Sequence, residues 1–228
     1  MSLADLVNHA VDKERFHTLD DYIAFCALYL EFAIVGDNGL QAQIVSQNEG
    51  HYQFFQYRED GSHNITRPIN TRLMYTAENF MAAAVRFRET FEQLRAAVQA
   101  TAEMRENLIR VIYTVQQSIG AALDALPAGQ SNRARKVNGD LFERFIRVLI
   151  TSLEVSCVSG TMQVPVRNGA GIELFKASYQ HDLLLSRNNE LKIIGSVKTS
   201  SKDRIDKVFM DKFLYNRLTE TALRVCQT

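Results

Sequence analysis

Apolar residues recur near the helical period of 3.6 residues in the first part of the chain. One such stretch predicts a helix over residues 18–34, which Gly36-Asp-Asn-Gly39 ends. Two longer stretches, over residues 76–99 and 101–126, are rich in Ala, Glu, Arg, Leu and Gln and contain no proline. We expect them to form either an antiparallel helix pair or one long broken helix.

Between these helices the pattern is typical of strands. Residues 41–57 place strand-forming residues on both sides of Asn48-Glu49-Gly50, where glycine can adopt a positive φ. This arrangement predicts a β-hairpin. A polar loop is predicted to follow it over residues 58–70.

The segment from Pro127 to Lys136 is the clearest internal break, because it combines proline, glycine, small polar residues and three basic residues. Beyond it the pattern predicts one helix, three strands and another helix, over residues 138–154, 161–167, 176–186, 190–199 and 203–218. We therefore expect two domains: residues 1–130, mainly helical with the hairpin, and residues 131–228. The expected fold class is α/β (α+β), with a mixed sheet flanked by helices.

Composition excludes several classes of protein. The 228 residues are 46% hydrophobic and 23% charged, as in an ordinary globular chain. No stretch reaches the roughly 18 apolar residues of a membrane span, and the first residues do not resemble a secretion signal. We therefore expect a cytoplasmic protein without a membrane partner. The three cysteines are far apart and predict neither a disulfide framework nor a zinc site.

The formal net charge of zero hides an asymmetry along the chain. Residues 1–130 hold 10 basic and 16 acidic residues, whereas residues 131–228 hold 16 basic and 10 acidic residues. A basic C-terminal part is compatible with binding to a polyanion, although such an asymmetry also arises by chance.

The C-terminal part contains a hairpin pattern that brings charged residues together. An apolar strand, an Asn-Asn turn and a second apolar strand occupy residues 180–198. A turn centred on Asn189 places Asp182 opposite Ser196, with Lys198 two residues further on. Because side chains alternate along a strand, Asp182, Ser196 and Lys198 are expected on one face. Such ion pairs also occur as ordinary cross-strand pairs at protein surfaces.

The residues after this hairpin add a second group of charges. Arg204, Lys207, Val208 and Asp211 follow the spacing of one helical stripe, so a second carboxylate is expected to face the same site. The alternative interpretation is a solvated helix face with ion pairs.

These residues resemble the PD-(D/E)-x-K nuclease superfamily. The motif is His181-Asp182 followed by Ser196-Val197-Lys198, with His in place of Pro and Ser in place of the acidic residue. Both departures resemble the EcoRII/NgoMIV-like group of type II restriction endonucleases, in which the displaced acidic residue returns on the next helix. Asp211, thirteen residues after Lys198, has this position, and Glu143 has the place of a glutamate on the preceding helix.

The resemblance implies a Mg²⁺-dependent, sequence-specific DNA endonuclease. Asp182, Asp211 and Glu143 are then the expected metal ligands, because Mg²⁺ prefers oxygen ligands. Lys198 is expected to orient the attacking water or stabilise the phosphate. Ser196 is expected only to keep the strand geometry.

The resemblance also implies how double-stranded DNA is recognised. Lys202 and Arg204 can donate to guanine and Asp203 can accept from cytosine, which suits a CC/GG core. Lys207 and His181 are further candidate DNA contacts, although His181 is equally well explained as a strand histidine satisfied by a neighbour. A homodimer, or a tetramer, is expected to bind a short pseudo-palindrome.

Alternative interpretations stay open. Ser196 and a tail over residues 222–228 that has room for one short strand at most favour a truncated, DNA-binding remnant of such an enzyme. A different class is a helical interaction protein that works through residues 76–126. Three basic residues near the break could grip phosphate or belong to a flexible linker, namely Arg133, Arg135 and Lys136.

Overall fold

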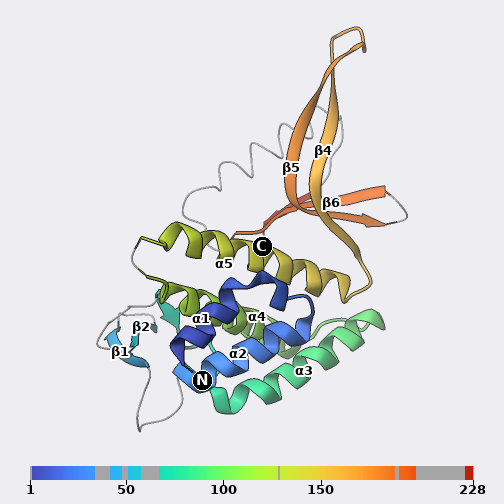
Figure 1. Ribbon diagram of the computed structural model, residues 1–228. Coiled ribbons are helices and arrows are strands. Elements are labelled where there is room, and N and C mark those ends of the chain that lie inside the picture. Colours follow the sequence, from blue (N-terminus) through green and yellow to red (C-terminus); the bar gives the residue numbers. More distant parts are fainter. Residues whose placement is uncertain are drawn as a thin grey trace. The chain divides into compact units, whose positions relative to one another are not determined.

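The computed structural model describes residues 2–33, 42–47, 51–57, 67–127, 129–187, 190–198 and 224–227, with the backbone alone for 42–47, 54–56 and 224–227. Two compact units are present, residues 1–141 and 142–228. In the described residues the first unit contains several helices and one sheet, and the second contains the end of one helix and another sheet (Figure 1). The expected α+β fold class is confirmed, and the two units are described separately below.

The first unit is mainly helical with one small sheet. In chain order it contains α1 (Leu3–Val11), a short 3₁₀ helix (Lys13–Arg15), α2 (Leu19–Ala33), β1 (Ala42–Gln47), β2 (Tyr52–Tyr57), β3 (Ile69–Asn70), α3 (Ala77–Arg95) and α4 (Ala102–Asp124). The sheet order is β1-β2-β3, and both strand pairs are antiparallel. The predicted hairpin is confirmed, and the two long helices are separate elements that pack against each other.

Three elements of the first unit were not predicted, namely α1, the short 3₁₀ helix and β3. Helix α1 begins with a capping box, in which Ser2 and Asp5 satisfy each other's backbone N–H groups. This pair of residues was the sequence signal for the helix. Strand β3 lies within the predicted polar loop, because residues 69 and 70 complete the sheet by pairing with β2.

Buried tyrosines connect the sheet of this unit to its helices. The hydroxyl of Tyr57 on β2 donates to the carbonyl of Ala121 on α4 at 2.7 Å and lies 2.9 Å from the hydroxyl of Tyr29 on α2. Burial raises the pKa of Tyr57 well above its ordinary value, so its hydroxyl stays protonated and can donate at neutral pH. The network thus gives each buried hydroxyl a partner.

A second link joins residue 67 to the end of α4. The guanidinium of Arg67 binds both carboxylate oxygens of Asp124, with Nε–Oδ2 at 2.9 Å and Nη2–Oδ1 at 2.8 Å. The guanidinium also lies against Gly120, where a Cβ atom would come within 2.1 Å of Arg67 Nη1. Gly120 therefore provides the space that this bidentate pair occupies.

Helix α5 (Ser131–Thr151) crosses from the first unit into the second. It begins seven residues before the predicted helix, because Ala134, Val137 and Leu141 are buried and extend the apolar stripe towards the N-terminus. The predicted boundary was at residue 130, whereas the units divide after residue 141. The linker interpretation of residues 133, 135 and 136 is wrong, since they lie in the first turns of α5.

The second unit contains one four-stranded mixed sheet. Its strands are β4 (Ser156–Arg167), β5 (Glu173–Arg187), β6 (Glu190–Ser196) and β7 (Arg224–Gln227), in the order β4-β5-β6-β7. The first three strands are antiparallel, and β7 runs parallel to β6. Residues 222–228 were expected to have room for one short strand at most, and β7 is that strand, at the edge of the sheet. The helix predicted over residues 203–218 lies outside the described residues.

Strands β4 and β5 are longer than predicted. They begin five and three residues before the expected starts at 161 and 176, because they pair with each other from Ser156 and Ser186 to Arg167 and Glu173. Among the described helices, none is long and apolar enough to cross a membrane.

Candidate active site

The β5–β6 hairpin sets the geometry of the candidate site. Arg187 pairs with Glu190 next to the turn, and Leu183 pairs with Gly195 further along the strands. The register shifts between these pairs, because Lys192 is an additional residue that has no partner on β5. This β-bulge moves the centre of pairing by half a residue. Beyond the bulge, Asp182 is aligned with Ser196. A hairpin without a bulge, with its turn centred on Asn189, would give the same alignment.

The carboxylate of Asp182 accepts three hydrogen bonds at one oxygen. Oδ2 receives the hydroxyl of Ser196 at 3.0 Å, the backbone N–H of Val197 at 2.9 Å and the ammonium of Lys198 at 2.8 Å. The predicted convergence of Asp182, Ser196 and Lys198 is therefore present in the structure. The contribution of Val197 was not predicted, because a backbone donor leaves no signal in the side-chain pattern.

The surroundings of Asp182 favour its ionised form. Burial acts to raise the pKa of Asp182, but the hydrogen bond from Lys198, the backbone N–H of Val197, the charge of Lys198 and the hydroxyl of Ser196 together lower it below its ordinary value. The carboxylate is consequently negative at neutral pH. The side chains of Asp182 and Lys198 keep 21% and 23% of their surfaces exposed, so the pair is partly accessible to solvent.

The strand residues next to the Asp182–Lys198 pair are closely packed. Val197 is 3% exposed and anchors the end of β6 in the core of the unit. Gly195 lies so close to Leu183 that a Cβ atom there would be 3.0 Å from the Cβ and Cδ1 atoms of Leu183. On the other side of β6, Ser196 pairs with Gln227 of β7. Strand β6 is therefore an interior strand at the point where it presents Ser196 to Asp182.

His181 lies next to Asp182, at the start of an irregularity in β5. The pairing of β4 with β5 shifts register between the Gly160–His181 pair and the Val158–Leu184 pair, which is a β-bulge at residues 182 and 183. The side chain of His181 is buried, and its ring stacks with that of Tyr179 at a centroid distance of 6.4 Å. A direct contact between His181 and DNA stays a prediction that this burial does not support.

Of the remaining expected site residues, only Glu143 lies in the described part of the chain. Glu143 lies on α5 with a half-buried side chain. Within the described part of the chain, no three His, Cys, Asp or Glu side chains are grouped so that they could hold a metal ion. Asp211, the expected second carboxylate, lies outside the described residues, and so do Lys202, Asp203, Arg204 and Lys207.

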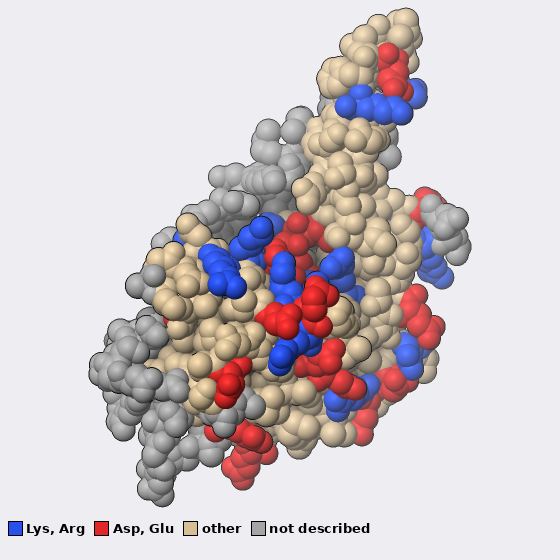
Figure 2. Space-filling model, in the orientation of Figure 1, with Lys and Arg blue, Asp and Glu red and all other residues tan. Residues whose placement is uncertain are grey.

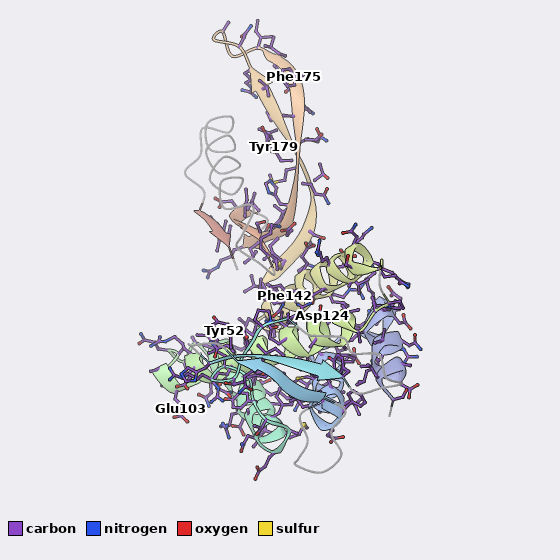
Figure 3. All side chains as sticks on the ribbon, turned by 90° about the vertical axis from the view of Figure 1, so that its left-hand side faces the viewer. Tyr52, Glu103, Asp124, Phe142, Phe175 and Tyr179 are labelled. Atoms are coloured by element: carbon purple, nitrogen blue, oxygen red, sulfur yellow. The ribbon has the colours of Figure 1, made fainter. Side chains whose placement is uncertain are left out.

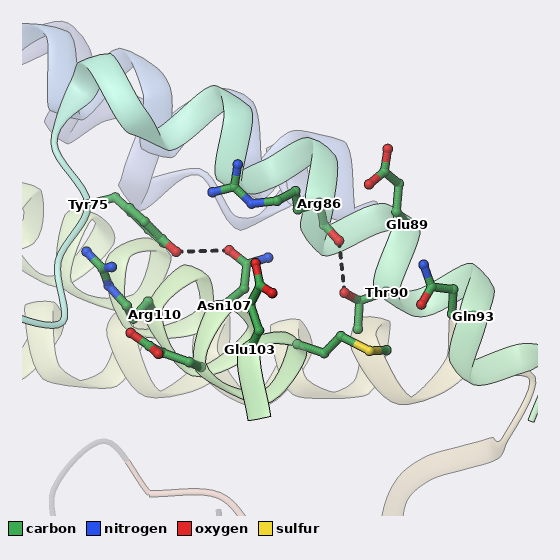
Figure 4. Close-up of a pocket in the computed structure, with 10 residues that line it drawn as sticks. Tyr75, Arg86, Glu89, Thr90, Gln93, Glu103, Asn107 and Arg110 are labelled. Carbon is green, nitrogen blue, oxygen red and sulfur yellow. Dashed lines mark hydrogen bonds between the residues drawn. The ribbon is translucent and has the colours of Figure 1, made fainter. Parts of the chain in front are cut away.

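A polar cleft of about 350 Å³ lies between α3 and α4 in the first unit (Figure 4). Two of its polar groups are hydrogen-bonded within the cleft: the hydroxyl of Tyr75 donates to Asn107 at 2.9 Å, and that of Thr90 donates to the carbonyl of Arg86 at 2.9 Å. The guanidinium of Arg110 lies 4.0 Å from the centre of the Tyr75 ring. These contacts join α3 and α4 across the cleft, whereas the buried Nε atom of Arg110 has no hydrogen-bond partner among the described residues.

Comparison with solved structures identifies a similar fold. The chain is similar to the crystal structure of the type IIP restriction endonuclease Kpn2I, with a TM-score of 0.61 and 14% sequence identity over 99% of this chain and 74% of that chain. No protein-family model and no curated protein matches the sequence. The structure therefore defines a protein with a restriction-endonuclease-like fold.

Proposed function

We propose that this chain is a Mg²⁺-dependent endonuclease that hydrolyses phosphodiesters in double-stranded DNA. The proposal is carried by the 2.8 Å pair between Asp182 Oδ2 and Lys198 Nζ, which is partly exposed to solvent. An ionised carboxylate beside an ammonium group is a suitable arrangement for charge developing on a phosphate. The similarity of the fold to a type IIP restriction endonuclease supports this choice among possible reactions.

The carboxylate of Asp182 fits one position of a Mg²⁺ site. The hydrogen bonds that reach it from the described residues all end at Oδ2, so Oδ1 is available to a cation. Asp211 and Glu143 are the proposed further ligands, and Mg²⁺ commonly keeps several of its waters. When bound, Mg²⁺ lowers the pKa of a water molecule and offsets negative charge on phosphate oxygens.

The residues around Asp182 have separate tasks in this proposal. Lys198 donates a hydrogen bond to the attacking water or to a phosphoryl oxygen of the substrate. Ser196 and the backbone N–H of Val197 hold Oδ2 in place, so that the carboxylate keeps its orientation when Lys198 turns to the substrate. Ser196 is thus a positioning residue.

The finer features of the proposed activity come from the sequence resemblance. We propose sequence-specific cleavage at a short pseudo-palindrome with a G·C-containing core, read by Lys202, Asp203 and Arg204, with Lys207 near the backbone. A homodimer in which each subunit cuts one strand fits such a site. Membership of the EcoRII/NgoMIV-like group belongs to the same proposal.

The direct test is cleavage of supercoiled plasmid DNA by the purified full chain in MgCl₂. We expect wild type to give discrete fragments, and Asp182→Asn and Lys198→Ala to give none. Arg187→Ala is the matched control, because Arg187 is an exposed cation on the same hairpin and is not among the donors to Asp182. Chelation with EDTA should stop cleavage. If wild type and Lys198→Ala leave the plasmid equally intact, the catalytic proposal is wrong.

A second candidate function is DNA binding without cleavage. It is favoured by Ser196, which stands where a nuclease of this superfamily commonly has a carboxylate and which is a weak metal ligand. Binding of wild type to duplex DNA, with no cleavage at any Mg²⁺ concentration, would select this candidate. The plasmid assay together with a binding measurement separates the two functions.

A further inference from the structure

The polar cleft between α3 and α4 belongs to the first unit, whereas Asp182 and Lys198 belong to the second. Its volume of about 350 Å³ is within the range of small-molecule sites, roughly 300–1,000 Å³. Five charged side chains are among the residues that line it, namely Arg86, Arg110, Glu89, Glu103 and Glu106. The cleft is therefore suited to a small polar ligand.

Buried polar groups form the floor of the cleft. The side-chain amide of Asn107 on α4 donates to the carbonyl of Ala83 on α3 at 3.2 Å, and its oxygen accepts from the hydroxyl of Tyr75 at 2.9 Å. All three residues are buried. Because Asn107 links the two sides of the cleft, the floor is held in one shape before a ligand binds.

Arg110 presents a guanidinium group that the described residues do not fully satisfy. Its central carbon lies 4.0 Å from the centre of the Tyr75 ring, which fixes the position of the group. The Nε atom is buried and has no hydrogen-bond acceptor in the described part of the chain. A buried charged donor without an acceptor is unfavourable, so an acceptor supplied by a ligand would stabilise it.

The charges of the cleft are not paired with one another. On the visible face of the first unit, side chains of opposite charge lie side by side (Figure 2), and two other arginines of α3 are paired, Arg88 with Asp20 and Arg95 with Glu92. By contrast, the described residues form no ion pair with either guanidinium group of the cleft. Two cations are therefore available to an anionic group of a ligand.

The two guanidinium groups lie towards one end of the cleft. Arg110 contacts the Tyr75 ring, and Figure 4 shows Arg86 extending from α3 towards Tyr75. Glu103 lies seven residues before Arg110 on α4, about 10 Å away along the helix axis. Its side chain is exposed at the surface of the first unit (Figure 3). A ligand that contacts both Arg110 and Glu103 therefore carries its anion and its donor groups at different ends.

We propose that this cleft binds a nucleoside monophosphate whose base carries an exocyclic amine. The phosphate lies between the guanidinium groups of Arg86 and Arg110, because the planar fork of arginine matches the geometry of phosphate oxygens. The exocyclic amine donates to the carboxylate of Glu103, as such amines do to acidic side chains in nucleic-acid recognition. Glu106, one turn before Arg110, accepts from the ribose hydroxyls. This site is separate from the proposed nuclease site and does not rest on it.

Two other classes of ligand match the cleft less completely. A polyamine would pair with the three carboxylates but would leave the buried Nε atom of Arg110 without an acceptor. Inorganic phosphate would satisfy the two guanidinium groups but would leave Glu89 and Glu103 without a donor. A molecule with a phosphate at one end and N–H groups at the other supplies both kinds of partner.

The test is isothermal titration calorimetry of the full chain with AMP, IMP, inorganic phosphate and spermidine, without divalent cations. IMP is the matched probe, because it has the same sugar and phosphate but a carbonyl in place of the exocyclic amine. We expect AMP to bind and IMP to bind at least roughly tenfold more weakly, since a carboxylate would then face a carbonyl oxygen. Phosphate should bind more weakly than AMP, and spermidine should not bind.

Variants assign the two ends of the ligand to their residues. Arg86→Ala should weaken AMP and IMP alike by roughly tenfold or more, as expected for a lost hydrogen bond to a charged group. Glu103→Gln should reduce the preference for AMP over IMP, because an amide can donate to the carbonyl of IMP. Arg110→Lys keeps the charge but removes the Nε donor and should also weaken AMP. Arg95→Ala is the control, since Arg95 is exposed on α3 and does not line the cleft.

Each contrary result overturns the inference. If AMP does not bind at millimolar concentration, the cleft is not a nucleotide site. If phosphate or spermidine binds as well as AMP, the assigned ligand class is wrong. If AMP binds but Arg86→Ala and Glu103→Gln bind it as wild type does, with the same preference over IMP, the nucleotide lies elsewhere.

Two controls keep these results separate from other causes. Arg86 and Glu103 are exposed, and far-UV circular dichroism of their variants confirms that a loss of affinity does not reflect unfolding. The proposed nuclease function is judged by plasmid cleavage with the Asp182 and Lys198 variants. Failure of AMP to bind therefore leaves that function standing, and failure of cleavage leaves the nucleotide site standing.

Discussion

The ammonium of Lys198 lies 2.8 Å from Oδ2 of Asp182, and the two residues belong to the two strands at the open end of a bulged hairpin. Lys198 follows the end of β6, and Asp182 lies on β5 at the point where pairing with β6 begins. Lys192 is an additional residue on β6, and it shifts the pairing register between the Arg187–Glu190 pair and the residues at the open end of the hairpin. A local irregularity of the backbone therefore determines which side chains meet at the candidate site.

Removal of Lys198 should raise the pKa of Asp182. Burial alone raises this pKa, and Lys198 contributes both a hydrogen bond and a charge that lower it, so Lys198→Ala should shift it upward. Ser196→Ala should shift it in the same direction by less, since the hydroxyl is the smallest of these contributions. Titration of the Asp182 carboxyl carbon by NMR measures both shifts. An unchanged pKa in Lys198→Ala would contradict the geometry of the pair.

The Asp182 carboxylate should stabilise the fold in a pH-dependent way. Its pKa is lowered in the folded protein, so its contribution is fully present above the pKa of the unfolded chain, about 3.9, and is lost as pH falls through the lower folded value. Asp182→Asn should therefore be less stable than wild type by roughly 1–2 kcal/mol at pH 7, as expected for charged hydrogen bonds. Urea unfolding at pH 7 and below pH 4 should show this difference shrinking in acid.

The hydroxyl of Ser196 should affect catalysis through Asp182. Ser196→Ala removes the 3.0 Å hydrogen bond to Oδ2 and should lower the plasmid-cleavage rate roughly tenfold, with little change in KM. Ser196→Thr keeps a hydroxyl and should restore much of the rate, while Ser156→Ala, an exposed serine on β4, serves as the control. Equal rates for Ser196→Ala and wild type would show that Oδ2 does not need this hydrogen bond.

Two strand glycines should respond differently to alanine. In Gly195→Ala the new methyl group meets Leu183 at 3.0 Å, so this buried position should be destabilised by about 1–3 kcal/mol through overpacking. In Gly160→Ala the nearest atom, Cδ1 of Leu184, is 4.0 Å away, and the change should be nearly neutral. Urea unfolding of both variants tests the difference. Equal effects would mean that the close approach of β5 and β6 is relaxed in solution.

Two helix glycines should give effects of opposite sign. In Gly120→Ala the methyl group would lie within 2.1 Å of Arg67, whose guanidinium is held by Asp124, so either the pair breaks or the helix shifts. We expect a loss of about 1–3 kcal/mol. Gly139→Ala has no neighbour within 4 Å and should stabilise α5 by about 0.5–1 kcal/mol. Calorimetry measures both effects, and Arg67→Ala should remove most of the penalty of Gly120→Ala.

The helices and the first hairpin could be predicted from the sequence. Helical periodicity and the absence of proline predicted α2, α3 and α4 to within a few residues of their observed ends. The start of α5 was misplaced, because Pro127 and Gly129 were interpreted as the centre of a long break. The buried side chains of Ala134 and Val137 show that the helix already begins at Ser131.

The candidate site was predictable in its residues but not in its geometry. The types and spacing of Asp182, Ser196 and Lys198 identified the chemistry, since these are properties of the chain itself. The predicted alignment assumed an unbulged hairpin centred on Asn189. The alignment is present in the structure for a different reason. Arg187 pairs with Glu190, so pairing next to the turn is centred half a residue before Asn189, and the additional residue Lys192 then shifts the centre back to Asn189.

The sequence by itself determined which segments form helices and strands and which charged residues can belong to one site. Local periodicity carries this information, because a helix or a strand face depends on residues that are near one another in the chain. The tertiary structure alone decided the bulge at Lys192, the N–H of Val197 as a third donor to Asp182, and the parallel pairing of β7 with β6. Each of these depends on which strands pair and in what register, and residues far apart in the chain determine that pairing.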